Sequence, residues 1–225
     1  MSAIAERYRA VRRRVSDAAD VVGRNPESVL IVAVAKTVGP AEVREAVSAG
    51  IRDFGENRVQ EFVGKHALFP EARWHFIGTL QKNKVQHVVG KAHLIHSVDS
   101  AHLLERIDRV AETQGVVQPV LLQVNISHEV SKHGFDRAEV TDLMERAMEF
   151  QNVVPRGLMT MAPLGTPELA RPVFRELHDL FESLRTMRFN EREFTELSMG
   201  MTNDFEVAVE EGATIVRVGR AIFGK

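Results

Sequence analysis

Lys36 is the residue of this sequence with the clearest capacity for covalent chemistry. It follows six apolar residues, Leu30 to Ala35, a run that predicts a strand buried on both faces of a parallel sheet. Gly39 and Pro40 then turn the chain toward a helix. Ligands meet parallel α/β folds at the C-terminal ends of the strands. An amine held there beside hydrocarbon is poorly solvated, which favours its uncharged, nucleophilic form. The alternative is a lysine that extends from the strand end into water.

Polar side chains also stand at the expected ends of the other strands. They are Glu56, Asn57, His75, Ser97, Asp99, Asn125, Thr160, Ser198 and Arg217. The segments 198–203 and 217–220 follow the last two expected strands and contain Gly200 and Gly219, which allow close approach to the backbone. In barrel folds, loops at these two places commonly hold a phosphate with backbone N–H groups. The two segments together predict a phosphorylated ligand.

One ligand fits both features of the sequence. Pyridoxal 5′-phosphate (PLP) carries an aldehyde, which reacts with an amine such as that of Lys36, and a phosphate, which the two late loops would hold. A sugar phosphate or an aldehyde phosphate that forms an imine with Lys36 is an alternative ligand. The coloured cofactor would distinguish the two possibilities.

These residues must be positioned by an alternating series of strands and helices. Strands are expected at 30–37, 53–57, 74–78, 94–98, 119–125, 157–161, 196–200 and 214–219. Helical patterns separate them, and a further helix is expected over residues 1–23. One of these helices is expected across Val85, Val88 and Val89, and another is expected to open at Asn203. Because no two-residue hairpin turn joins the strands, the units are parallel.

Eight such units predict one α/β domain over residues 1–225, a single (β/α)₈ TIM-type barrel with an extra N-terminal helix. A doubly wound open sheet is the second possibility. With 29 basic and 31 acidic residues, the charge gives no electrostatic case for nucleic acid or membrane. The lack of Cys excludes disulfides, thiolate nucleophiles and Cys-ligated metals. No signal peptide or membrane span is expected, so we predict a cytoplasmic protein and a monomer.

Eight segments of the chain resemble the pyridoxal-phosphate homeostasis protein family. They are Ala33–Thr37, Phe54–Asn57, Trp74–Gly78, Leu80–Lys84, Ser131–Gly134, Arg156–Met159, Leu197–Met201 and Val216–Gly224. That family is similar to the barrel domain of fold-type III enzymes, alanine racemase among them, without their second domain. The resemblance spans nearly the whole chain. So many motifs in the same order are highly specific, although each alone is not.

The resemblance implies a role for each of nine residues. Lys36 would form the Schiff base with PLP, and Arg217 would face the pyridine nitrogen. The phosphate would be held by Ser198, Gly200 and the backbone of Gly219 and Arg220. The pocket would be lined by Asn57, His75 and Met159.

Two residues depart from the pattern of the family that the sequence resembles. Val38 stands where relatives often carry a second lysine, which removes an amine that could relay the cofactor. Arg220 stands where a Ser or Thr is common, which puts a hydroxyl contact to the phosphate in doubt. A cation at Arg220 could replace that contact.

The resemblance implies a non-enzymatic protein that carries or buffers PLP and so maintains vitamin B6 and amino-acid pools, with PLP-dependent apoenzymes as its partners. The alternative is a PLP-dependent amino-acid racemase. A racemase needs a second proton donor opposite Lys36, and the only Tyr of the chain, Tyr8, lies on the leading helix. Lys132 is a candidate second amine for cofactor exchange. We expect no metal site, because His93 and His96 on a strand would not converge.

Overall fold

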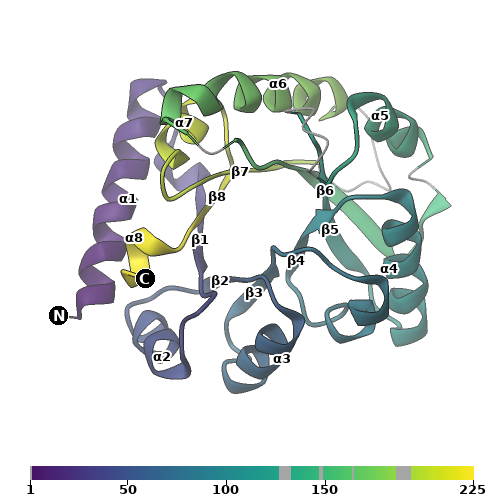
Figure 1. Cartoon of the computed structure of the whole chain (residues 1–225), viewed down its shortest axis with the longest axis horizontal. Helices are drawn as coiled ribbons and strands as arrows, with labels where there is room; N and C mark the ends of the chain where they lie inside the picture. Colours follow the sequence, from purple (N-terminus) through teal and green to yellow (C-terminus); the bar gives the residue numbers. More distant parts are fainter. Residues whose placement is uncertain (1, 127–132, 147–148, 164, 186–193) are drawn as a thin grey trace.

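The chain forms a closed barrel of eight parallel strands. The computed structural model describes residues 2–126, 133–146, 149–163, 165–185 and 194–225. The strands follow one another around the barrel in sequence order, and β8 pairs with β1 to close it (Figure 1). They are β1 Leu30–Val34, β2 Asp53–Glu56, β3 Arg73–Phe76, β4 Leu94–Val98, β5 Gln118–Gln123, β6 Val153–Met159, β7 Glu196–Met201 and β8 Ile215–Val218. The predicted (β/α)₈ barrel is confirmed, and the open sheet is wrong.

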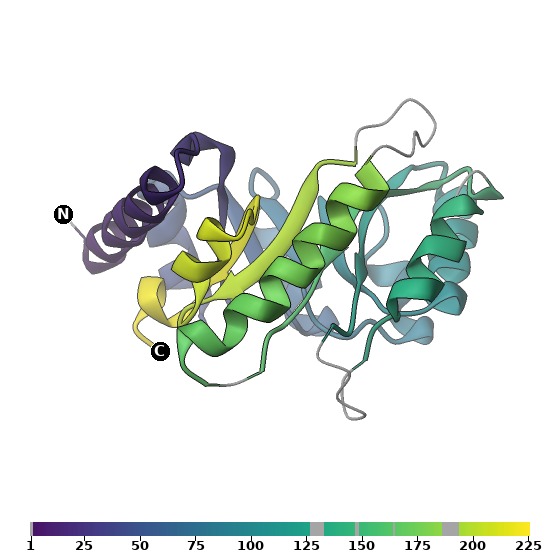
Figure 2. The ribbon, with the colours of Figure 1, turned by 90° about the horizontal axis from the view of Figure 1, so that it is seen from above.

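Helices surround the barrel. They are α1 Ala3–Val21, α2 Pro40–Ser48, α3 Val59–Leu68, α4 Ala101–Gln114, α5 Arg137–Glu145, α6 Pro167–Arg185, α7 Phe205–Glu210 and α8 Arg220–Phe223, with two 3₁₀ helices, η1 Pro26–Ser28 and η2 Lys82–His87. The extra N-terminal helix that the sequence predicts is α1, which packs against α2, α7 and α8 (Figure 2). Of the described helices, none combines the length and the apolar character needed to cross a bilayer.

Apolar side chains fill both faces of the sheet. The larger cluster lies between the strands and the helices and includes Phe54, Trp74 and Phe174. A separate cluster consists of Val32, Leu94, Leu121, Met159 and Ile215, with Leu30 packed against it. Each member of the smaller cluster comes from a different strand except Val32 and Leu30, as expected of side chains that point into a barrel. The strands therefore read as apolar runs in the sequence because both of their faces are buried.

Local capping signals position several helices as the sequence predicts. Asp136 and Glu139 form a capping box at the start of α5, in which each side chain accepts from the other residue's backbone N–H at 2.8 Å. Ser100 caps α4 through the N–H of Leu103. Gly50, just beyond α2, has φ +90°, the left-handed conformation that a helix end favours in glycine.

Two predicted helices differ from the structure. The segment with Val85, Val88 and Val89 forms no α-helix: Val85 lies in the 3₁₀ helix η2, and Val88 and Val89 lie in the turn that follows it. All three valines are fully buried, so the 3₁₀ helix and its following turn bury the same apolar residues that the predicted helix would have buried. The helix α7 begins after Asp204 rather than at Asn203. Asp204 Oδ1 accepts from the N–H of Met201, which ties the helix start to the end of β7.

Candidate functional site at the C-terminal mouth of the barrel

Lys36 lies just beyond β1, at the C-terminal edge of the barrel, as predicted. The N–H of Ala35 donates to the carbonyl of Gly55 on β2, and the chain then turns through Thr37, whose φ is +63°. Lys36 itself is exposed. The expectation that its amine is poorly solvated is therefore wrong in this structure, because the turn carries the side chain beyond the hydrocarbon of the strand.

The side chain of Lys36 borders a pocket of about 510 Å³. The pocket is also lined by Thr37, Val38 and Gly39 from the same turn and by Glu56, Asn57, Arg58 and Glu61 from the end of β2 and the start of α3. Its volume lies within the usual range for small-molecule sites. Two of the expected cofactor residues, Lys36 and Asn57, are thus brought to one pocket.

A buried ion pair that the sequence reasoning missed anchors the Lys36 turn. Lys65 on α3 donates to Glu56 at 2.6 Å and to the carbonyl of Ala35 at 2.8 Å. Glu56 in turn accepts from the N–H groups of Asn57 and Arg58, at 2.7 and 3.3 Å. Both charged side chains are almost fully buried. One ion pair therefore fixes the backbone on each side of the pocket.

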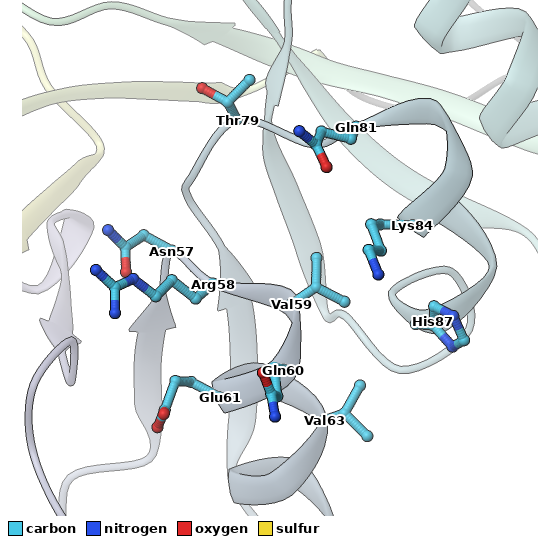
Figure 3. Close-up of a pocket in the computed structure, with 10 residues that line it drawn as sticks. All are labelled: Asn57, Arg58, Val59, Gln60, Glu61, Val63, Thr79, Gln81, Lys84 and His87. Atoms are coloured by element: carbon cyan, nitrogen blue, oxygen red, sulfur yellow. The ribbon is translucent and has the colours of Figure 1, made fainter.

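A second pocket, of about 620 Å³, adjoins the first and shares Asn57, Arg58 and Glu61 with it. Figure 3 shows its walls: Val59 and Val63 on α3 face the η2 segment, which contributes Lys84 and His87. The side chains of Asn57 and Arg58 extend away from η2 (Figure 3). The segment 80–84, one of the motifs singled out in the sequence, thus forms the outer wall of this pocket through Gln81 and Lys84.

The loops after β7 and β8 carry the residues expected to hold a phosphate. Gly200 has φ +88°, and a Cβ there would lie 2.5 Å from the Cβ of Ala208 on α7. A Cβ at Gly219 would lie 3.2 Å from the carbonyl of Val34. Gly200 therefore lies where a side chain does not fit, and Gly219 lies in tight contact with β1. Arg220 donates to Asn203 at 3.1 Å, which links the two loops, and a phosphate contact of these residues stays a prediction.

Four of the expected site residues lie inside the barrel. Ser198, Arg217, His75 and Met159 are all buried. Arg217 donates to Ser198 Oγ at 2.6 Å and to the carbonyl of Thr160 at 2.9 Å. His75 is hydrogen-bonded within the interior, and Met159 belongs to the inner apolar cluster. Neither residue lines the two pockets described above, so their contact with a cofactor stays a prediction.

The surroundings of three interior side chains shift their pKa values and so determine which of them are charged. Burial lowers the pKa of Arg217 to about 10, against the opposing effect of Asp204, so its guanidinium is protonated at neutral pH. Burial and the neighbouring His75 and Arg217 hold the pKa of His96 well below 6.5, so that imidazole is neutral. Burial raises the pKa of Asp53, but hydrogen bonds from His75 and Arg73 outweigh it and leave the pKa lowered.

Two other expectations concern Tyr8 and Lys132. Tyr8 packs against the outer core from α1. Lys132, the candidate exchange amine, lies outside the described residues. Among the residues that the structure describes, no group of three or more His, Asp or Glu side chains is placed to hold a metal ion.

Comparisons with known proteins agree with this architecture. The family model of the alanine racemase N-terminal domain matches residues 1–225. The pyridoxal phosphate homeostasis protein of Aquifex aeolicus is 42% identical, over 98% of this chain and 97% of its own length. The structure of PipY from Synechococcus elongatus PCC7942, solved with PLP bound, is 39% identical with a TM-score of 0.85, and the match covers 98% of this chain and 100% of PipY.

More distant structures share the fold alone. Diaminopimelate decarboxylase from M. jannaschii is 14% identical with a TM-score of 0.72, and the match covers 97% of this chain but 59% of that enzyme. The full-length matches at much higher identity are the ones that carry the assignment. This chain belongs to the alanine racemase N-terminal domain family and, within it, to the pyridoxal phosphate homeostasis proteins.

Proposed function

We propose that this protein binds PLP covalently at Lys36 and carries or buffers it, without a turnover of its own. The observation that carries the proposal is the position of Lys36, an exposed amine beside a pocket at the C-terminal mouth of a barrel. An aldehyde would condense with this amine and lose water, which links the cofactor reversibly to the chain. The related PipY, whose structure was solved with PLP bound, supports PLP as the ligand.

The side chains of the chain suit the remaining groups of PLP. Arg217 would donate to the pyridine nitrogen, because β8 lies next to β1 and Arg217 pairs in register with Val32, four residues before Lys36. No side chain caps the start of α8, and the first backbone N–H groups after Gly219 would hold the phosphate. Ser198, Gly200 and Arg220 would complete the contacts to that phosphate, and Asn57, just beyond β2, would border the ring.

The chemistry of Arg217 argues against turnover. A guanidinium donates a hydrogen bond but keeps its proton, so the pyridine nitrogen stays unprotonated. An unprotonated ring is a weaker sink for electrons than one paired with a carboxylate, and carbanion chemistry is disfavoured. Tyr8, the only Tyr of the chain, packs in the outer core from α1 and is not at the mouth as a second proton donor. We therefore favour a carrier over a racemase.

The same proposal extends to partners and location. A carrier without turnover needs acceptors, so we propose PLP-dependent apoenzymes as recipients. We propose a cytoplasmic monomer, in keeping with a formal net charge of −2 and with exposed large apolar side chains that fall on separate elements, such as Val21 on α1 and Leu169 on α6.

Titration of the purified protein with PLP tests the proposal. We expect an absorption band of an imine in the wild type and its loss in Lys36→Ala, with Lys91→Ala, another exposed lysine, as the matched control. In deuterated water, the loaded protein should exchange no α-proton of alanine or other single amino acids. Exchange that depends on Lys36 would establish the racemase alternative. A colourless protein that reacts with sugar or aldehyde phosphates would overturn PLP as the ligand.

A further inference from the structure

A continuous series of hydrogen bonds joins five buried side chains through the interior of the barrel. Asp53 Oδ1 lies 3.2 Å from His75 Nε2, and His75 Nδ1 lies 3.0 Å from His96 Nε2. His96 Nδ1 lies 2.9 Å from Ser198 Oγ, which accepts from Arg217 Nη1 at 2.6 Å. All five residues are at most 5% exposed. We call this series the interior relay.

The interior relay crosses the barrel from its base to its mouth. Asp53 is the first residue of β2, and it is paired at the base with Arg73, whose side chain is half exposed. The bond between His96 and Ser198 joins β4 to β7, which are not neighbours in the sheet. Such a bond must pass through the interior. The apolar inner cluster, with Leu94 and Ile215, packs in the same interior.

The number of protons on each group fixes the direction, from donor to acceptor, of every hydrogen bond in the interior relay. Arg217 has no acceptor and must donate to Ser198. Ser198 has one hydroxyl proton, which it donates in a hydrogen bond to His96 Nδ1. A neutral His96 then carries its proton on Nε2 and donates to His75 Nδ1. A neutral His75 likewise donates from Nε2 to the carboxylate of Asp53. Every proton has an acceptor, in keeping with the absence of unpaired buried polar side-chain atoms among the described residues.

The opposite direction fails at both ends of the series, because a neutral His75 with its proton on Nδ1 would turn an unprotonated Nε2 toward the carboxylate of Asp53. If His75 carried its proton on Nδ1, His96 would have to carry its own on Nδ1 and donate to Ser198. Ser198 Oγ would then accept from both His96 and Arg217, and its own proton would have no acceptor among the bonds found there. A buried hydroxyl proton without an acceptor costs about 1–3 kcal/mol. The forward direction is therefore strongly preferred.

The interior relay also links the buried guanidinium of Arg217 to a negative charge. Arg217 is buried, and its hydrogen-bond partners are a hydroxyl and a carbonyl; the carboxylate of Asp204 acts on its charge without an ion pair in the described part of the chain. A buried cation needs compensation. The relay ends on the carboxylate of Asp53, and each intervening group is polarised in the same sense, which strengthens the whole series. The low pKa of His96 and the lowered pKa of Asp53 fit the neutral and ionised forms that the direction requires.

We propose that Asp53, His75 and His96 are positioning residues, which orient Ser198 as an acceptor and so hold the guanidinium of Arg217 in place at the base of the cofactor site. This inference rests on the proposed function, since Arg217 is the expected partner of the PLP ring. It also assigns His75 and Ser198 a role inside the chain; because the hydroxyl proton of Ser198 is donated to His96, a phosphate contact of Ser198 would come from its backbone. Asp53, at the far end of the barrel, thereby influences the orientation of the guanidinium that would donate to the cofactor.

Nuclear magnetic resonance of the protein with ¹⁵N-labelled histidine, without cofactor, tests the relay directly. Long-range ¹H–¹⁵N correlation distinguishes the two neutral tautomers from the cation, and loss of signals in His75→Gln and His96→Gln assigns the rings. We expect both histidines to be neutral at pH 7 with the proton on Nε2. A proton on Nδ1 of either ring, or a cationic ring, would overturn the relay. The tautomers themselves are read from the wild type, and the two variants serve only to assign each signal to its ring.

A variant at the far end tests the link to the cofactor. In Asp53→Asn, we expect a changed His75 tautomer population and a weaker hold on Arg217, with the PLP dissociation constant raised about 3- to 10-fold while Lys36 still reacts. The matched control is His93→Gln, because the ring of His93 contacts that of His75 but makes none of the relay bonds. The control should leave the tautomers and the affinity unchanged. Equal behaviour of the two variants would contradict the proposal.

The two proposals fail separately. If the tautomers are as expected but no PLP is trapped at Lys36, the proposed function falls and the direction of the relay stands. If PLP is trapped at Lys36 but the tautomers differ, the relay falls and the proposed function stands. An unchanged affinity in Asp53→Asn with altered tautomers would remove the positioning role alone.

Discussion

At the scale of residues, buried charges decide how the mouth of the barrel is built. Lys65 and Glu56 form one anchored pair beneath the Lys36 turn, and Arg217 is anchored by the interior relay. Neither arrangement follows from the sequence alone. The residues of each set come from different elements, and only the register of neighbouring strands and the closure of the barrel bring them together. Polar residues within otherwise apolar strands, such as His96, are the signal that could have indicated the relay.

Removal of Lys65 should destabilise the protein strongly. In Lys65→Met, the carboxylate of Glu56 stays buried without its cation, which costs about 3–5 kcal/mol of unfolding free energy. Urea denaturation measures this loss. The double variant Lys65→Met/Glu56→Gln should recover part of it, because Gln is uncharged and can still accept from the N–H of Asn57. A single variant that loses under about 1 kcal/mol would contradict the importance of the pair.

His96 should make stability depend on pH. Its pKa in the folded state lies well below 6.5, so the unfolded state binds the proton first as the pH falls. The stability present above pH 6.5 is therefore lost below it, at up to about 1.4 kcal/mol per pH unit for one proton. His75, His93 and Arg217 are the charged or titratable groups that act on it. Denaturation at several pH values should show a steeper loss in the wild type than in His96→Gln, and parallel curves would refute this account.

At the scale of elements, periodicity and caps predicted most of the fold. The capping box of α5 and the cap of α4 are local features, and each appears where the sequence places it. The segment 82–89 was misassigned because an α-helix, and a 3₁₀ helix followed by a turn, can bury the same three valines. The start of α7 was predicted one residue too early. Asp204, not Asn203, precedes the helix, and its side chain is held by the N–H of Met201 at the end of the preceding strand.

The close approach of the ends of β2 and β3 should tolerate no side chain at Gly78. A Cβ there would overlap the carbonyl oxygen of Asn57, so Gly78→Ala should cost about 1–3 kcal/mol or more and displace Asn57 from the Lys36 pocket. Gly64→Ala is the matched control. Gly64 lies on the exposed face of α3 with open space around it, so this change should stabilise the protein by about 0.5–1 kcal/mol. Thermal unfolding of both variants checks the contrast, and a neutral Gly78→Ala would contradict it.

At the scale of the whole molecule, closure of the barrel brings the two ends of the sequence to one site. The pairing of β8 with β1 places Gly219 beside the strand that leads to Lys36. The helix α1 supports this junction from outside through an ion pair of 2.6 Å between Arg14 and Glu206 on α7. Arg24, just beyond α1, donates to the carbonyls of Val209 and Ala213. The N-terminal segment thereby braces the helices that follow β7 and β8.

Binding of PLP should stabilise this closed arrangement. A ligand that binds only the folded state adds about 2.7 kcal/mol at a concentration 100 times its dissociation constant. For a chain of 225 residues this corresponds to a rise in melting temperature of roughly 5–10 °C. Most of the rise should disappear in Lys36→Ala, and pyridoxine 5′-phosphate, which has no aldehyde, should give less of it. Equal stabilisation of the wild type and Lys36→Ala would show that the amine contributes nothing to binding.

Reductive trapping tests the central claim most directly. Borohydride converts an imine between PLP and a lysine into a stable amine, and peptide mapping by mass spectrometry then identifies the lysine. The account predicts a single dominant adduct, on Lys36, in a protein that still binds PLP reversibly before reduction. An adduct mainly on another lysine, or no adduct at all, would contradict it.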